Sequence, residues 1–161
     1  MLKKILLFLL LVFVVIQFIH PARNKSKEAS PNYIGNRFAI PDDVKHILQK
    51  ACNDCHSNNS VYPWYSYIQP VDWWLTKHIN DGKKELNFDE YTNRSLRYQY
   101  HKMEEIEEVM NEKSMPLDSY TWIHREAKLS SSEKQSLVNW AASIRKQLES
   151  TYPMDSLVRR N

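Results

Sequence analysis

Residues Cys52-Asn53-Asp54-Cys55-His56 form the pattern C-x-x-C-H, which is typical of the attachment of a c-type haem. Two thiols at this spacing could form thioethers with the two vinyl groups of one porphyrin. The histidine could then bind the iron, which haem proteins commonly coordinate through this residue. On a helix, positions i, i+3 and i+4 share one face. Cys52, Cys55 and His56 would therefore point toward one flat cofactor.

Three other interpretations of the motif remain open. A redox dithiol of the thioredoxin type lies beside a βαβ pattern, and the chain shows no alternating strands. A structural zinc site needs four ligands, and the chain offers only scattered histidines beside its two cysteines. A disulfide between residues three apart closes too small a loop to add much stability. The motif and its surroundings favour haem attachment over all three.

The composition indicates one helical domain with short additional segments. A length of 161 residues suits one domain, and the presence of only two glycines favours helices over an all-β fold. Residues 1–37 carry six Lys or Arg and one acidic residue, whereas residues 38–161 carry sixteen Lys or Arg and eighteen Asp or Glu. Because the excess of basic residues belongs to the N-terminal segment, the domain gives no support for a nucleic-acid partner.

Residues 1–20 predict a membrane anchor, either a transmembrane helix or an uncleaved signal. Lys3 and Lys4 precede fifteen residues, 5–19, of which only Gln17 is polar. A full span needs about 20 apolar residues, so this run is short and close to a signal-peptide core. Residues 20–23, His-Pro-Ala-Arg, supply no A-x-A-like site for a signal peptidase, so we expect the anchor to remain in the bacterial inner membrane. Bacterial haem attachment takes place outside the cytoplasm, which would place the domain in the periplasm.

The remaining chain divides into three parts. Residues 21–37 are polar and contain Pro and Gly, which predicts a flexible linker. Residues 38–150 are expected to form an all-α, cytochrome c-like domain around one covalent haem, and residues 151–161 a tail. Helices are expected to run from Pro41 into the haem motif, from Pro70 to about Gly82, over 95–113, and over 130–149, where Ser130 and Glu133 predict a capping box.

An aromatic loop is expected directly after the haem motif. Residues 57–67 contain several Asn and Ser and a proline, which predict a break between helices. Trp64, Tyr65 and Tyr67 crowd this loop. Their rings could cover the porphyrin edge, and ordinary core packing is an equally compatible interpretation.

The second iron ligand is expected from the loop around Met115. Proline disfavours helix in the preceding residue, so Met115 should lie in a turn or an extended segment. Its thioether is a soft ligand, and His/Met coordination is the cytochrome c arrangement that raises the reduction potential. The helical spacing of Met103 and Met110 assigns them to the core. His124 and His78 are the alternative axial ligands.

The chain resembles class I cytochromes c in its C-x-x-C-H motif, its Met-Pro loop and its last helix. More narrowly, residues 40–145 are similar to the bacterial haem-binding domain family of small cytochrome c-like proteins. The resemblance implies covalent haem c, a helical fold and export, with Cys52 and Cys55 as attachment residues, His56 as proximal ligand and Met115 as the second ligand. The similar motifs are Cys52 with His56-Ser57-Asn58, Tyr62-Pro63-Trp64-Tyr65-Ser66, Gln69-Pro70, Trp73-Trp74, His78-Ile79, Gly82, Leu86-Asn87-Phe88, Met115-Pro116-Leu117, Tyr120, and Leu129-Ser130 with Glu133, Leu137 and Trp140.

The expected function is one-electron transfer in the periplasm, with haem c and its iron as cofactor. The expected protein partners are redox proteins of unknown identity. The N-terminal helix is expected to bind the membrane. An electron carrier is favoured over an enzyme. The first alternative is a haem enzyme or sensor, such as a peroxidase-like domain, with an open or labile sixth iron position. A module that positions an oxidase partner, with haem as a structural core, is a further alternative.

Overall fold

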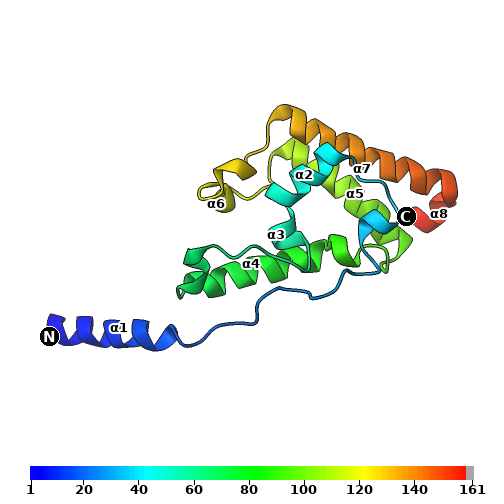
Figure 1. Cartoon of the computed structure of the whole chain (residues 1–161). Coiled ribbons are helices and arrows are strands. Elements are labelled where there is room, and N and C mark those ends of the chain that lie inside the picture. The colour runs from blue at the N-terminus through cyan, green and yellow to red at the C-terminus, as the bar shows by residue number, and fades with distance from the viewer. Residues whose placement is uncertain (159–161) are drawn as a thin grey trace.

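The computed structural model describes residues 1–158 as helices joined by loops (Figure 1). This range contains no strand, only an isolated bridge between Lys25 and Asn59. The all-helical prediction is therefore confirmed. The last three residues of the predicted tail, 159–161, lie outside the described part. The α-helices are α1 (Leu2–Ile16), α2 (Asp42–Ala51), α3 (Asn53–His56), α4 (Val71–Glu85), α5 (Leu96–Glu112), α6 (Asp118–Thr121), α7 (Ser131–Thr151) and α8 (Met154–Leu157), and the 3₁₀ helices are η1 (Ile34–Asn36), η2 (Trp64–Tyr67), η3 (Phe88–Glu90) and η4 (Arg125–Ala127).

The predicted starts of the domain helices are confirmed by their caps. The Ser130 side chain accepts a hydrogen bond from the backbone N–H of Glu133, and the Glu133 side chain accepts one from the backbone N–H of Ser130. Ser95 caps α5 in the same way, through the backbone N–H of Tyr98. Pro41 and Pro70 directly precede α2 and α4. The sequence predicts these helix starts because each capping residue acts within one helical turn.

Helices α2, α5, α7 and α8 form a tightly packed unit, which we call the packed half (Figure 1). Helix α7 lies along α5 and contacts α2, and α8 closes against α5. The Trp140 indole N–H donates to the carbonyl of Ala39 at 3.1 Å, so the polar edge of this buried ring is satisfied. The fully buried side chains here include Met103, Leu137, Ile144, Leu148 and Leu157. Each such burial stabilises the fold by about 1.5–3 kcal/mol.

Helices α3 and α4 and the 3₁₀ helix η2 form a looser unit, which we call the open half. Helix α6 is joined to this half through side chains, such as the Tyr120 hydroxyl that donates to Asp54. Among the described residues, the buried hydrophobic core cluster takes no member from 53–85. Helix α4 lies beside α3 and below it in Figure 1, on the side away from α7. The open half therefore meets the packed half across the haem motif rather than through a shared apolar core.

Two predicted helix boundaries near the motif are wrong. The helix from Pro41 breaks at Cys52, whose backbone (φ −125°, ψ −44°) caps α2 and starts the short α3. Helix α4 does not stop near Gly82 but continues to Glu85. A Cβ atom at Gly82 would lie 2.7 Å from the Cys55 carbonyl oxygen. Gly82 is therefore not a helix end but a point of close approach between α4 and the haem motif.

No residue of helix α1 is buried, and only Ile16 at its end is partly covered. Within residues 1–158, no helix combines the length and the apolar character needed to cross a membrane. Part of the predicted linker, by contrast, contacts the domain. The Asn24 side chain donates to the Ser57 carbonyl at 2.9 Å and to the Ser60 hydroxyl at 2.8 Å.

Candidate haem-binding site

The C-x-x-C-H motif occupies a single helical turn. The backbone N–H groups of Cys55 and His56 both donate to the Cys52 carbonyl, at 3.1 and 2.9 Å. Both cysteines are free thiols. Burial raises the pKa of Cys52 to about 12 and that of Cys55 to about 11, with a smaller contribution from neighbouring negative charge. Both thiols are therefore protonated at neutral pH.

The His56 ring is held in one orientation. Its Nδ1–H donates to the Leu86 carbonyl at 2.9 Å, and the Phe88 ring packs edge-on against it at 6.3 Å. Burial lowers the pKa of His56, and the hydrogen bond to Leu86 only partly opposes this shift. The neutral ring, with its proton on Nδ1, leaves a lone pair on Nε2. Such a backbone contact is how metal-binding histidines are commonly oriented.

Two adjoining cavities, of about 220 and 290 Å³, lie between the packed and the open half. We call them together the crevice. Both are lined by Cys52, His56, Met115 and Pro116. The smaller cavity is otherwise lined mainly by apolar side chains of the packed half, whereas the larger adds residues of the open half. These lining residues are Leu48, Phe88, Ile106, Met110 and Leu137 in the first cavity, and Cys55, His78, Gly82 and Tyr120 in the second.

The residues of the crevice fit a covalently attached haem. Cys52 and Cys55 would hold it through thioethers, and a neutral imidazole and a thioether are a known axial pair for haem iron. The apolar walls suit a flat, mostly apolar cofactor.

The model of the haem-binding domain family matches residues 11–143. The chain belongs to this family. The match includes the motif, the crevice and Met115. The chain is also 28% identical over 102 residues to the cytochrome c peroxidase Ccp of Escherichia coli (strain K12), an alignment that covers 62% of the chain and 22% of the peroxidase. The chain thus spans about a fifth of the length of that relative. No solved structure matches the chain.

The structure distinguishes among the three residues that the sequence proposes as second iron ligand of this haem-binding domain. Met115 lines both cavities of the crevice together with His56. His78 reaches only the larger cavity, and its Nδ1 donates to the Trp74 carbonyl at 2.8 Å. His124 lines neither. The structure therefore brings Met115 and His78 toward His56, and not His124.

His124 is already engaged elsewhere. Its Nε2 lies 2.5 Å from the Tyr65 hydroxyl, its Nδ1 lies 3.3 Å from a Glu126 carboxylate oxygen, and its ring stacks on Tyr120 at 4.2 Å. With both nitrogens in contact with partners, His124 would have to break a hydrogen bond to bind a metal.

The aromatic residues that face the crevice are not those of the predicted aromatic loop. Trp64, Tyr65 and Tyr67 do not line it, and Phe88 and Tyr120 do. The Tyr120 hydroxyl donates to the Asp54 carboxylate at 2.8 Å. Burial, and then the charge of Asp54, raises the pKa of Tyr120. Tyr120 thereby ties the loop after Met115 to the haem motif.

Lys102 is a buried lysine of the crevice that the sequence did not indicate. Only 9% of the Lys102 side chain is exposed, and its Nζ lies 2.6 Å from a Glu105 oxygen and 3.4 Å from a Glu85 oxygen. Burial alone would lower the pKa of Lys102, but the two carboxylates raise it on balance, so the charge persists. Its only sequence signal was the three-residue spacing from Glu105, since Glu85 belongs to another helix.

Proposed function

We propose that this haem-binding domain is a cytochrome c-like electron carrier with a covalent haem. The observation that carries the proposal is that His56 and Met115 line the same two cavities, beside the thiol of Cys52. A histidine and a methionine in one crevice supply the two axial positions of a haem between them.

Each crevice residue has a separate role in this proposal. The haem supplies reversible one-electron chemistry. Cys52 and Cys55 would hold it through thioethers, and the Leu86 carbonyl, which accepts from Nδ1, leaves Nε2 of His56 free to bind the iron. Met115 would supply the second iron ligand, which would raise the reduction potential and keep other ligands away from the metal. Electrons would then pass through the exposed haem edge to redox partner proteins.

We further propose that α1 anchors the domain to the outer face of a bacterial inner membrane, in the periplasm. The support is the surface of α1, whose residues from Leu2 to Val15 are all exposed, with only Lys3 and Lys4 charged. An apolar surface of this extent is unfavourable in water and marks a site of contact with a membrane or a protein. The domain would face the periplasm, because covalent haem attachment takes place outside the cytoplasm.

The test of the ligand assignment is the visible spectrum of Met115→Leu beside wild type, after co-expression with a haem-attachment system. Met110→Leu is the matched control, because Met110 lines the same crevice but lies on the core face of α5. Wild type and Met110→Leu should show the weak charge-transfer band at the red end of the visible spectrum that is typical of oxidised His/Met haem, and Met115→Leu should lose it. An unchanged low-spin spectrum of Met115→Leu would contradict the assignment and favour His78.

The second candidate is a peroxidase-like haem enzyme, favoured by the similarity to cytochrome c peroxidase Ccp. Such an enzyme needs a sixth iron position that is open or readily vacated. Rapid binding of cyanide and carbon monoxide to the wild-type protein, together with a high-spin spectrum, would establish this function and overturn the electron-carrier proposal.

A further inference from the structure

The exposed large hydrophobic side chains of the domain are concentrated in two segments. Beyond residue 19, every such side chain of the described chain except Met154 lies within 61–74 or 117–123. The most exposed are Trp64 at 77% and Trp122 at 75%. Scattered apolar residues are normal on a protein surface, but a concentration of this kind marks a contact surface.

The two segments form one continuous surface. The Tyr65 hydroxyl lies 2.5 Å from Nε2 of His124, which joins η2 to the loop after α6. A small pocket of about 70 Å³ is lined from both sides, by Trp74 of one segment and Ile123 of the other among its residues. We call this surface the apolar rim. Its exposed members are Val61, Trp64, Tyr67, Ile68, Trp73, Trp74, Leu117, Trp122 and Ile123.

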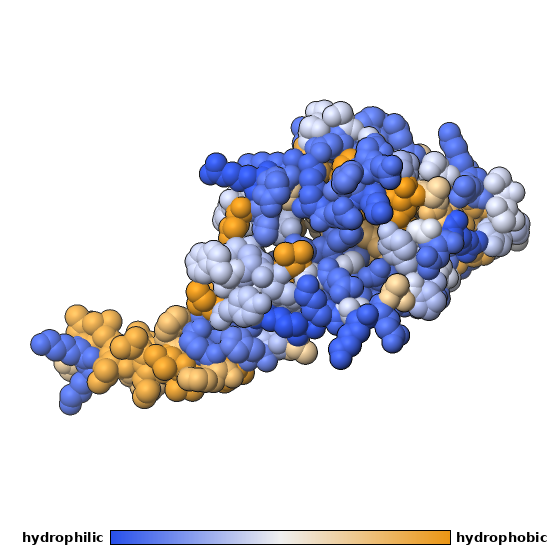
Figure 2. Space-filling view, in the orientation of Figure 1, coloured by the Kyte–Doolittle hydropathy of each residue, from blue (hydrophilic) through white to orange (hydrophobic). Residues whose placement is uncertain are grey.

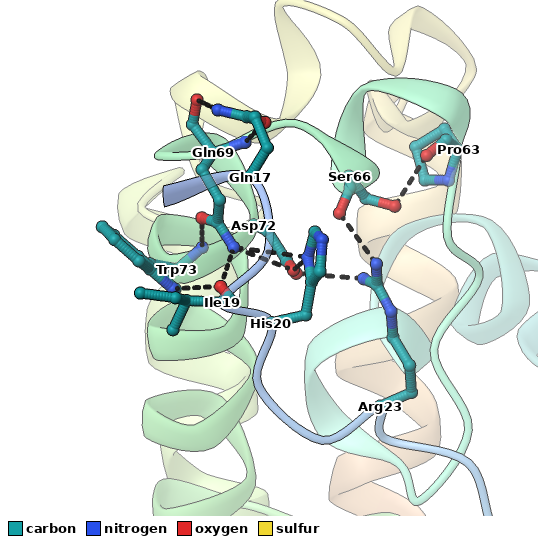
Figure 3. Close-up of polar contacts among 9 residues, drawn as sticks. All are labelled: Gln17, Ile19, His20, Arg23, Pro63, Ser66, Gln69, Asp72 and Trp73. Atoms are coloured by element: carbon teal, nitrogen blue, oxygen red, sulfur yellow. Dashed lines mark hydrogen bonds and ion pairs between the residues drawn. The ribbon is translucent and has the colours of Figure 1, made fainter. Parts of the chain in front are cut away.

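The end of α1 is fastened to the same surface (Figure 3). The Gln69 backbone N–H donates to the Gln17 side chain at 2.9 Å, and the Gln69 side chain donates to the Ile19 carbonyl at 2.7 Å. The Trp73 indole N–H donates to the same carbonyl at 3.0 Å. The apolar helix therefore leaves the domain directly beside Trp73, a member of the apolar rim. Figure 2 shows this helix as an apolar projection from one end of the domain.

A buried carboxylate fixes the direction in which α1 leaves. Asp72 is fully buried, and its oxygens contact His20 Nδ1 at 2.8 Å and Arg23 at 3.0 Å. Arg23 also donates to the Ser66 carbonyl at 3.0 Å (Figure 3). Its guanidinium lies over the Tyr67 ring. Removing one partner of a buried charge is costly, so these contacts hold the segment after α1 in place. Residues 20–23 act here as a rigid joint.

We propose that the apolar rim rests on the surface of the bilayer that holds α1. The inference depends on the proposed membrane anchorage and adds the side that the domain turns to the lipid. Trp and Tyr prefer the membrane–water interface, because each combines an apolar ring with a polar group. The rigid joint favours the bilayer as the surface that covers the rim. Insertion of α1 would bring the rim to the lipid without any movement of the domain relative to α1. Leu117 and Tyr120 line the crevice from the segment that carries Trp122, so the haem would lie close to the membrane surface.

The test is hydroxyl-radical footprinting of the full-length holoprotein in vesicles of phosphatidylethanolamine and phosphatidylglycerol. Met154 is the internal reference, because it is 48% exposed and lies in α8, at the end of the domain remote from α1 (Figure 1). At high lipid-to-protein ratio, oxidation of Trp64 and Trp122 should fall at least about fivefold relative to Met154, as expected of rings buried at the interface. Equal oxidation in vesicles that carry the protein would overturn the proposal.

Two further outcomes would also overturn it. Protection that disappears as the lipid-to-protein ratio rises would show that a second copy of the chain covers the rim. A holoprotein that fails to float with the vesicles would disprove the anchorage, while an unchanged haem spectrum would leave the electron-carrier proposal intact.

A matched pair of variants separates lipid contact from folding. Trp64→Glu combined with Trp122→Glu should lift the rim from the bilayer and restore oxidation of Tyr67, whereas Met154→Glu should leave Tyr67 protected. The haem spectrum of both variants should equal that of wild type. Continued protection of Tyr67 in the double variant would contradict the proposal.

Discussion

The packed and the open half of this domain differ in what holds them together. The packed half surrounds buried aliphatic and aromatic side chains from α2, α5, α7 and α8. The open half contributes no residue from 53–85 to that core, and two cavities separate it from α5 and the start of α7. The difference indicates that a haem in the crevice would complete the hydrophobic core of the open half. The cofactor would thus be structural as well as functional.

The largest effect should follow from removing the haem itself. In Cys52→Ser combined with Cys55→Ser we expect no covalent haem, and amide exchange in α4 should accelerate by about 100-fold, because the open half loses its main apolar contact. Exchange in the middle of α7 should change little. Hydrogen exchange read by mass spectrometry measures both helices in one sample. Equal acceleration of α4 and α7 would show that the two halves fold as one unit and remove the contrast between them.

Core truncations should separate the halves next. Ile144 of α7 is 1% exposed and surrounded by the packed core, whereas Ile79 of α4 is 6% exposed and borders a pocket. Ile144→Ala should lower the free energy of unfolding by about 3–4 kcal/mol, and Ile79→Ala by about 1–2 kcal/mol, since a site beside a pocket has fewer contacts to lose. Urea denaturation of the holoproteins measures both values. A larger loss for Ile79→Ala would reverse the comparison.

The contact between α4 and the motif is tested by Gly82→Ala. The added Cβ would meet the Cys55 carbonyl at 2.7 Å, a backbone atom that cannot move without moving the motif. We expect a loss of about 1–3 kcal/mol in unfolding free energy and less haem attached per chain. Gly35→Ala is the control, because the atoms nearest to its Cβ, although closer still, belong to the Tyr33 side chain, which can shift without moving the motif. If Gly82→Ala binds haem and unfolds like wild type, the close approach has no structural importance.

The smallest effect concerns the polar edge of the packed half. Lys50, and then the Ser130 backbone N–H, lower the pKa of Glu133 from 4.5 to about 2. Because the folded pKa lies below the unfolded one, the carboxylate stabilises the fold above about pH 4.5, and this contribution is lost as the pH falls toward 2. Glu133→Gln should therefore cost about 0.5–1 kcal/mol at pH 7, and the difference from wild type should shrink below pH 4.

Denaturation of Glu133→Gln and wild type at several pH values measures this dependence. Glu108→Gln, at an exposed position of α5, is the control and should match wild type throughout. A difference between Glu133→Gln and wild type that stays constant from pH 7 to pH 2 would assign the loss to packing instead of charge.

The features that the sequence predicted well are those encoded within one or two helical turns. The capping box of Ser130 and Glu133 and the prolines before α2 and α4 placed these helix starts correctly. The periodic spacing over 95–113 likewise predicted α5. The periodic spacing of Met103 and Met110 assigned both to the core face of α5, where they are buried. The family was likewise predicted from local motifs and is confirmed.

The features that the sequence did not predict depend on contacts between distant residues. The sequence predicts a helix end at Gly82, because a glycine at a close helix crossing and a glycine at a helix end look alike in sequence. Nothing in the sequence indicates the role of Asp72, since its partners His20 and Arg23 lie about fifty residues earlier, one in the predicted anchor and the other in the predicted linker. The Leu86 carbonyl that orients His56 is a backbone group, which residue identity does not encode.

The most direct test of the central claim is the intact mass of the wild-type protein under denaturing conditions, after export in a strain competent in cytochrome c maturation. The account predicts the mass of the chain plus one haem, and Cys52→Ser combined with Cys55→Ser should lack the added mass. A wild-type chain that carries no haem under these conditions would contradict covalent attachment, and with it the proposed role of the crevice.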